Sequence, residues 1–405
     1  MNDKKNFIWN FIGVTLNAFT SFFFLIIVNR VNGIDVAGIF SYAYSIDCLF
    51  FFLSMYYSRS YQIANYNDNK NFNQFLTFRF IFCVISLFVT LMFCIINKFS
   101  TLKILIIMLI MAYRTIEAIS DAIFGYLQNK DQLYKTGISF SLKAVFGILL
   151  FLVVDLILNS VIYSLLVLLF ICLIILIFYD FNSLFKVYDK SNLKLDINNF
   201  RLIIKEALPI FIISFLGVYL ANLQKYILTY YEADNIQAIF AIIIMPATML
   251  SLVGNYLINP FISNLNNSVK QSDYKKFFNI SKKILLSLFL IGMLGMIVCY
   301  FIGIPILNFI YDINLSDYKL GLIIIIFASI LTASSMILSN LLVLLKSNNS
   351  QLLIYVFSSI IATLIGVILI KNYSINGAIL SYLITYFIVF ILYLFIFIKK
   401  YLELR

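Results

Sequence analysis

The chain has 405 residues, of which 63% are hydrophobic and only 12% are charged, and its formal net charge at pH 7 is +11. A soluble protein carries roughly 25% charged residues, so this composition excludes an ordinary soluble domain. Apolar segments recur from end to end, and each is long enough to cross a hydrocarbon core about 30 Å thick. These segments are continuous and lack the alternation of a membrane β-barrel. The sequence therefore predicts an all-α polytopic membrane protein.

About twelve transmembrane helices are predicted along the chain. The first begins near Phe7, and no small-residue cleavage site follows it, so we expect an uncleaved span and not a signal peptide. The basic connection at 182–202 separates a six-helix bundle at 1–181 from a second at 203–405, and we expect it to be a cytoplasmic linker. The predicted helices are 8–31, 36–58, 74–97, 102–128, 133–155, 159–181, 203–230, 235–262, 277–302, 317–345, 350–371 and 374–398.

The basic residues indicate how the chain is oriented in the membrane. With the N-terminus inside, most Lys and Arg residues fall at the predicted cytoplasmic ends of the helices. The predicted outer ends hold only Arg30, Lys98, Lys103, Lys319 and Lys371. The positive-inside rule then predicts that both termini are cytoplasmic. The positive net charge indicates anionic membrane lipids as partners, and no nucleic acid is expected.

Two pairs of similar segments indicate an internal repeat. The segments "DVAGIFSYAYSI" (35–46) and "NIQAIFAIIIMP" (235–246) each open the second helix of a six-helix half. The segments "GYLQNKDQLYK" (125–135) and "LLVLLKSNNSQLL" (341–353) each end a fourth helix. Repeats in matching positions predict two bundles related by an axis along the membrane normal, which can rock about a central cavity.

The fourth predicted helix carries three ionisable residues, Arg114, Glu117 and Asp121, on one face. A charge at the bilayer centre costs at least ~2.5–3.5 kcal/mol, so such residues normally face a bundle interior or a watery cavity. Two interpretations are open. Arg114 and Glu117 form an internal salt bridge that ties helices together, or this face is a functional site that opens to a cavity.

Other charged residues extend this candidate site. Lys143 lies within the fifth helix, which must pack antiparallel to the fourth, so it can approach the depth of Asp121. Asp47 lies midway along the second helix, where a carboxylate needs a basic partner or a proton. Four further charged candidates lie nearer helix ends, where long side chains reach water. They are Arg30, Arg59, Asp155 and Lys225.

The other residue types limit the chemistry. The chain has no histidine and five scattered cysteines, so we expect no metal site, disulfide framework or cofactor. All four prolines lie in the second half, and Pro246 and Pro260 are expected to interrupt one helix and let it bend.

Several of these segments resemble one transporter family. They are the asparagine-bearing first helix, "VNGIDVAGIF" (31–40), "SRSYQI" (58–63) and the run "YR…E…D…GYLQNKDQLYK" that ends at Lys135. They are similar to the polysaccharide repeat-unit flippases, which export O-antigen and capsule units and belong to the multidrug/oligosaccharidyl-lipid/polysaccharide (MOP) exporter superfamily. The resemblance implies two six-helix bundles around a cationic cavity in the bacterial cytoplasmic (inner) membrane. It also implies a substrate, an oligosaccharide on undecaprenyl pyrophosphate, and a polysaccharide polymerase is a further candidate partner.

The candidate residues fit that substrate. A bare pyrophosphate cannot cross hydrocarbon, but guanidinium and ammonium groups in a wet cavity offset the cost. The candidate substrate-binding residues are Arg114, Lys143, Arg59, Lys225 and Arg30. The candidate coupling-ion or ion-pair residues are Asp47, Glu117 and Asp121. No catalytic residue is expected, because a flippase is not an enzyme.

Two other functions compete with this interpretation. A cation-coupled multidrug or small-solute antiporter of the same superfamily would use an isolated carboxylate in an apolar pocket, whereas bases equal or outnumber acids in these spans. A membrane glycan polymerase or glycosyltransferase would need a sizeable external loop with catalytic residues. The longest predicted outer loop, 303–317, is short.

Overall fold

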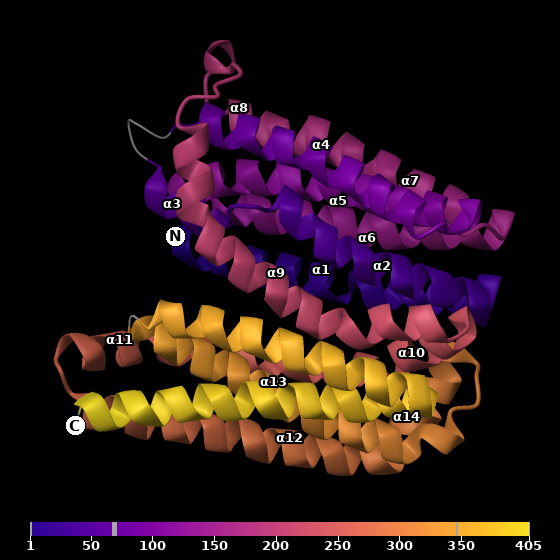
Figure 1. The fold of residues 1–405 in the computed structure, drawn as a ribbon. Coiled ribbons are helices and arrows are strands. Elements are labelled where there is room, and N and C mark those ends of the chain that lie inside the picture. Colours follow the sequence, from indigo (N-terminus) through magenta and orange to yellow (C-terminus); the bar gives the residue numbers. More distant parts are fainter. Residues whose placement is uncertain (1, 67–70, 346, 405) are drawn as a thin grey trace. The chain divides into compact units, whose positions relative to one another are not determined.

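The computed structural model describes residues 2–66, 71–345 and 347–404, and these residues form helices joined by short connections (Figure 1). The first half contains α1 (Asn2–Asn32), α2 (Ile34–Ser54), α3 (Arg59–Asn65), α4 (Phe72–Ile96), α5 (Thr101–Asn129), α6 (Leu133–Leu158), α7 (Val161–Ile175) and α8 (Asn182–Phe185). The second half contains α9 (Phe200–Tyr231), α10 (Asp234–Ile258), α11 (Ile262–Lys270), α12 (Tyr274–Tyr311), α13 (Lys319–Leu344) and α14 (Asn348–Leu404).

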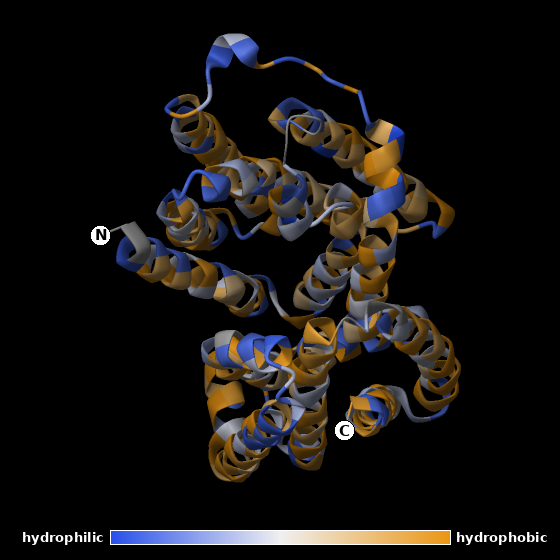
Figure 2. Cartoon of the chain, turned by 90° about the vertical axis from the view of Figure 1, so that its left-hand side faces the viewer, coloured by the Kyte–Doolittle hydropathy of each residue, from blue (hydrophilic) through white to orange (hydrophobic). Residues whose placement is uncertain are grey.

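The predicted all-α membrane architecture is confirmed. Within the described residues, nine helices are long and apolar enough to cross a membrane. Two of the predicted spans are not among these nine helices. They are α5, which carries Arg114, Glu117 and Asp121, and α10, whose apolar part is the shorter stretch Asp234–Leu250. The long α14 contains a non-helical residue, Ser374, with φ 50° and ψ −129°, which divides it where the last two predicted helices meet. Figure 2 shows that hydrophobic residues dominate the helices, while hydrophilic residues gather in the connections and helix ends.

Polar residues set the helix starts in the first half. The side chains of Ser58, Asn71 and Ser100 accept hydrogen bonds from backbone N–H groups at the starts of α3, α4 and α5, respectively. Such caps satisfy donors that have no partner inside a helix. Between α1 and α2, Gly33 has φ 87°, a conformation that only glycine adopts without strain, and the chain reverses there in a single residue.

The chain forms two compact units, Met1–Phe215 and Leu216–Arg405. The border lies inside α9, the helix expected to open the second bundle. Tyr56 stacks on Phe211 with ring centroids 4.5 Å apart, and Tyr61 donates a hydrogen bond of 2.7 Å to Glu206. These contacts hold the first part of α9 to the first unit.

The two units repeat one packing pattern. In the first unit α2, α4 and α5 pack against one another, and α3 follows α2. In the second unit α10, α12 and α13 do the same, and α11 follows α10. The predicted repeat of the second and fourth helices therefore corresponds to α2 with α10 and α5 with α13.

Two local features bear on how the helices move and pack. Pro246 lies inside α10 without ending it, whereas Pro260 lies in the 3-10 turn between α10 and α11. The interruption expected at both prolines is therefore present only at Pro260.

In the first unit α1 and α6 approach so closely that a Cβ on Gly13 or Gly137 would strike backbone of the facing helix.

Candidate functional site

Buried charge is confined to the first unit among the described residues. The buried charged side chains are Asp47, Arg79, Lys103, Glu117, Asp121, Lys143, Asp155 and Asp180. Three clusters of them meet on α5, which packs against α2, α3, α4, α6 and α7. Because α5 is surrounded by helices, its charged face is turned to protein and not to lipid, as expected for ionisable groups at membrane depth.

The first cluster is centred on Arg114. Its Nε donates to Asp47 Oδ2 at 2.8 Å, one terminal nitrogen donates to Glu117 Oε2 at 2.6 Å, and the other contacts the Tyr44 hydroxyl. Tyr113 donates to the second oxygen of Glu117 at 2.7 Å. The predicted pair of Arg114 and Glu117 is therefore present, and Asp47 has the basic partner that its burial requires. All three nitrogens of the guanidinium are engaged by the protein itself.

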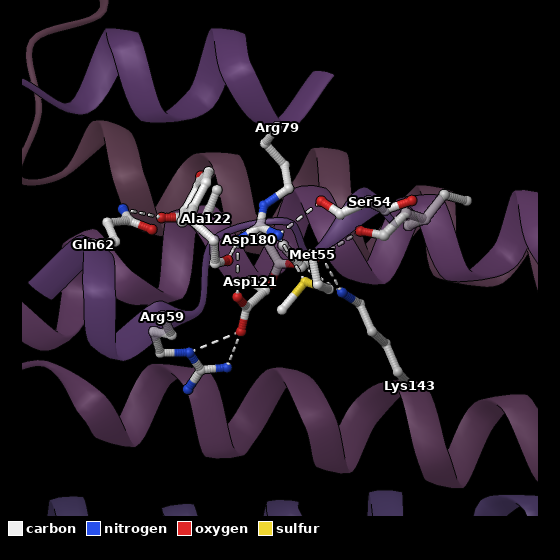
Figure 3. A network of polar contacts seen from close by, with 12 residues as sticks. Ser54, Met55, Arg59, Gln62, Arg79, Asp121, Ala122, Lys143 and Asp180 are labelled. Carbon is white, nitrogen blue, oxygen red and sulfur yellow. Dashed lines mark hydrogen bonds and ion pairs between the residues drawn. The ribbon is translucent and has the colours of Figure 1, made fainter. Parts of the chain in front are cut away.

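The second cluster joins two arginines to one carboxylate (Figure 3). Arg59 bonds to Asp121 Oδ1 through Nε at 2.8 Å and through a terminal nitrogen at 2.5 Å. Arg79 approaches Asp121 Oδ2 at 3.3 Å and donates to the carbonyl of Ser54 at 2.9 Å. The side chain of Arg79 is fully buried, whereas that of Arg59 is 22% exposed. Arg59 and Arg79 thus share the single carboxylate of Asp121, and of the two arginines only Arg59 is exposed at the surface of the structure.

Arg79 was missed as a candidate in the sequence. It is a single arginine within the apolar run "QFLTFRFIFC" of the third predicted helix, so the cost of burying a charge already marked it. In the structure it packs over the Tyr57 ring, 4.1 Å from the centroid. The Nε of Arg79 is buried without a hydrogen-bond partner among the described atoms.

The third cluster contains Lys143. Its Nζ donates to Asp180 Oδ2 at 2.7 Å and to Ser120 at 2.5 Å, and the Ser120 hydroxyl also lies 2.7 Å from the same Asp180 oxygen. Asp180 is fully buried, and it lies in a π-helical turn, Leu176–Phe181, that continues α7. Such turns shift the side-chain register and are common at functional sites. Asp180 lies at the end of the predicted helix 159–181 and was not among the candidate residues in the sequence.

The other candidate residues lie apart from these clusters. Arg30 is exposed in the last turn of α1, and Lys225 is half-buried on α9 in the second unit. Asp155 is buried near the end of α6, where Asn32 donates to it at 2.6 Å and Ser164 at 3.1 Å. Asp155 is thus held by neutral donors that connect α1, α6 and α7.

The three clusters together pair four cations with four anions within the first unit. Arg59, Arg79, Arg114 and Lys143 supply the cations. Asp47, Glu117, Asp121 and Asp180 supply the anions. Each cluster connects α5 to at least one further helix, so a change of partners in any of them would alter how these helices pack.

No protein-family model matches the chain. A capsular polysaccharide biosynthesis protein, CapF, from Staphylococcus aureus is 24% identical over 395 residues, which cover 96% of this chain and 98% of that protein. An inward-facing multidrug resistance MATE family transporter of the MOP superfamily aligns with a TM-score of 0.72 at 13% identity, covering 98% of both chains. The chain has the MOP-superfamily fold.

A second solved structure supports the same fold. The lipid II flippase MurJ, in an inward closed conformation, also aligns with a TM-score of 0.72 at 13% identity, over 100% of this chain and 89% of that one. The MOP fold accounts for the twelve helices and for the repeat of the second and fourth helix in each unit.

Proposed function

We propose that the chain is a flippase that moves undecaprenyl-pyrophosphate-linked oligosaccharide repeat units from the cytoplasmic to the outer leaflet by alternating access. The units would supply a surface polysaccharide such as O-antigen, capsule or exopolysaccharide. The observation that carries this proposal is the Arg59–Arg79–Asp121 cluster, in which two guanidinium groups share one carboxylate inside an apolar bundle. The CapF relative and the MurJ-like fold support the same class of function.

The chemistry of the cluster suits a pyrophosphate headgroup. Guanidinium groups form paired hydrogen bonds with phosphate oxygens, and in a low-dielectric site such bonds are stronger than between neutral groups. Arg59 is the accessible member, so we assign it the first contact with the headgroup. Arg79 is fully buried and shares Asp121 with Arg59, so the three side chains together carry a net positive charge.

The carboxylates provide a way to couple binding to a change of conformation. A phosphate oxygen that bonds to Arg59 would replace Asp121 as its partner, and protonation of Asp121 would also release Arg59. Arg114 and Lys143, which are held by Asp47 with Glu117 and by Asp180, would exchange partners in the same manner. Lys225 and Arg30 would then act as outlying contacts along the path of the substrate.

The membrane orientation follows from the same proposal. In the first unit the N-terminus, α3 and α8 lie at one end (Figure 1). We assign this end to the cytoplasm of the bacterial inner membrane, because the predicted cytoplasmic charges gather there. The headgroup would then meet Arg59 first, since Arg59 opens α3.

The class of function is tested by deleting the gene. Lipid-linked repeat units should accumulate on the cytoplasmic leaflet and surface glycan should be lost, as measured by leaflet-specific labelling and glycan staining. A cell that keeps normal surface glycan but becomes sensitive to cationic drugs would contradict the proposal. It would favour the cation-coupled antiporter, which the equally good alignment with the MATE transporter supports.

The binding role is tested at Arg59. Arg59→Gln should lower glycan export more than tenfold while membrane abundance stays near normal, because Asp121 keeps Arg79 as a partner. Arg59→Lys should retain part of the export, since it keeps the charge and loses the fork geometry. The control is Arg201→Gln, an exposed arginine at the start of α9. Unchanged export by Arg59→Gln would exclude Arg59 from the substrate path.

A further inference from the structure

An apolar groove runs along the second unit between α12, α13 and α14. It has a volume of about 580 Å³, and its walls are mostly hydrophobic, with Leu285, Leu286 and Phe289 from α12 and Leu394 from α14. The two walls meet where the Phe278 ring lies 4.7 Å from Phe397 and 4.2 Å from Tyr401. We call this feature the α12–α14 groove.

The groove is open on the surface of the unit. Leu286 is 53% exposed and Phe289 is 43% exposed, although both are large and apolar. An open apolar groove on a membrane protein is filled by hydrocarbon chains, because water molecules there would find no hydrogen-bond partners.

One end of the groove is basic. Lys282 and Asn279 line it beside the apolar walls, and both side chains are exposed. Lys275, Lys276 and Lys283 line an adjoining hollow with Asn279, where Asp273 is the only acidic residue of the lining. The carboxylate of Asp273 accepts a hydrogen bond from the backbone of Lys276 as the cap of α12, so it is directed to the helix and not to the lysines.

We propose that the α12–α14 groove is a binding site for an anionic phospholipid of the bilayer. An acyl chain lies along the apolar walls, Lys282 pairs with the phosphate, and Asn279 donates to it through its amide. Basic hollows between membrane helices bind anionic headgroups in this way, because each Lys near the headgroup adds to the attraction. The site is independent of the proposed transport function, and none of the buried charges among the described residues lies in its unit.

The test uses the full chain reconstituted in vesicles of equal parts phosphatidylglycerol and phosphatidylcholine. Native mass spectrometry after gentle release should show phosphatidylglycerol retained in preference to phosphatidylcholine. Lys282→Gln should weaken that retention about fivefold. Lys371→Gln, which removes an exposed lysine that lines neither hollow, should leave it unchanged.

A second pair of variants tests the apolar walls with the lysines intact. Leu286→Trp fills the groove and should reduce retention of phosphatidylglycerol, whereas Leu290→Trp, on an exposed residue of α12 outside the groove, should not. Equal retention of both lipids would overturn the proposal, because the groove would then hold annular lipid without selection. Equal losses in the two members of either pair would also overturn it. So would displacement of phosphatidylglycerol by a polyprenyl phosphate at lower concentration, which would reassign the groove to the substrate chain.

Discussion

Arg114 is the residue whose replacement should disturb the first unit most. Arg114→Gln leaves Asp47, which is fully buried, and Glu117, which is 8% exposed, without their shared cation. Removing one member of a buried ion pair costs about 3–5 kcal/mol, because the other charge stays desolvated. A loss of that size is a large share of the roughly 5–15 kcal/mol that stabilises a typical domain. We therefore expect Arg114→Gln to accumulate poorly and to unfold at a clearly lower temperature.

The other members of the cluster should follow a defined order. Glu117→Gln leaves Arg114 paired with Asp47 through the 2.8 Å bond, so it should be much milder. The double variant Arg114→Gln with Glu117→Gln still strands Asp47 and should recover only partly. Adding Asp47→Asn removes the last charge, and the three amides can bond to one another, so this triple variant should restore abundance.

The assay separates a structural from a functional role for Arg114. Membrane abundance and thermal unfolding of the solubilised protein are measured beside surface glycan, with Arg201→Gln as the exposed control. If Arg114 binds the headgroup, the triple variant accumulates but exports nothing. If the triple variant still exports glycan, the Arg114 cluster has only a structural role, and we would assign headgroup binding to Arg59 and Lys143. An Arg114→Gln protein as stable as the wild type would refute the energetic reasoning itself.

Three further outcomes are expected. Reporter fusions after Lys276 should read cytoplasmic and those at Asn314 external, and an internal signal at Asn314 would contradict the twelve-helix topology. Lys143→Gln should strand the Asp180 carboxylate and lower stability by about 3–5 kcal/mol, which a thermal melt shows as a lower unfolding temperature. An unchanged unfolding temperature would show that Asp180 is not ionised. Gly137→Ala should cost about 1–3 kcal/mol by forcing α1 and α6 apart, whereas Gly295→Ala, with nothing within 4 Å, should be neutral or slightly stabilising in the same melt.

The sequence alone determined the helices and their order. Continuous apolar runs can satisfy their backbone groups in a membrane only as helices, so the number and approximate limits of the spans follow from composition. The helix break at Ser374 follows from the same apolar runs, whereas the repeat of the second and fourth helices was predicted from the similar segments at 35–46 and 235–246 and at 125–135 and 341–353. The spacing of Arg114, Glu117 and Asp121 placed them on one helix face, because that geometry is local.

Only the tertiary structure decided which charges pair. Lys143 and Asp121 belong to neighbouring helices, yet Lys143 pairs with Asp180, and Asp121 pairs with Arg59 and Arg79. The π turn that places Asp180 has no mark in the sequence. An ion pair between distant segments is set by the depth and rotation of whole helices, and these are fixed by packing across the unit and not by residue spacing along the chain.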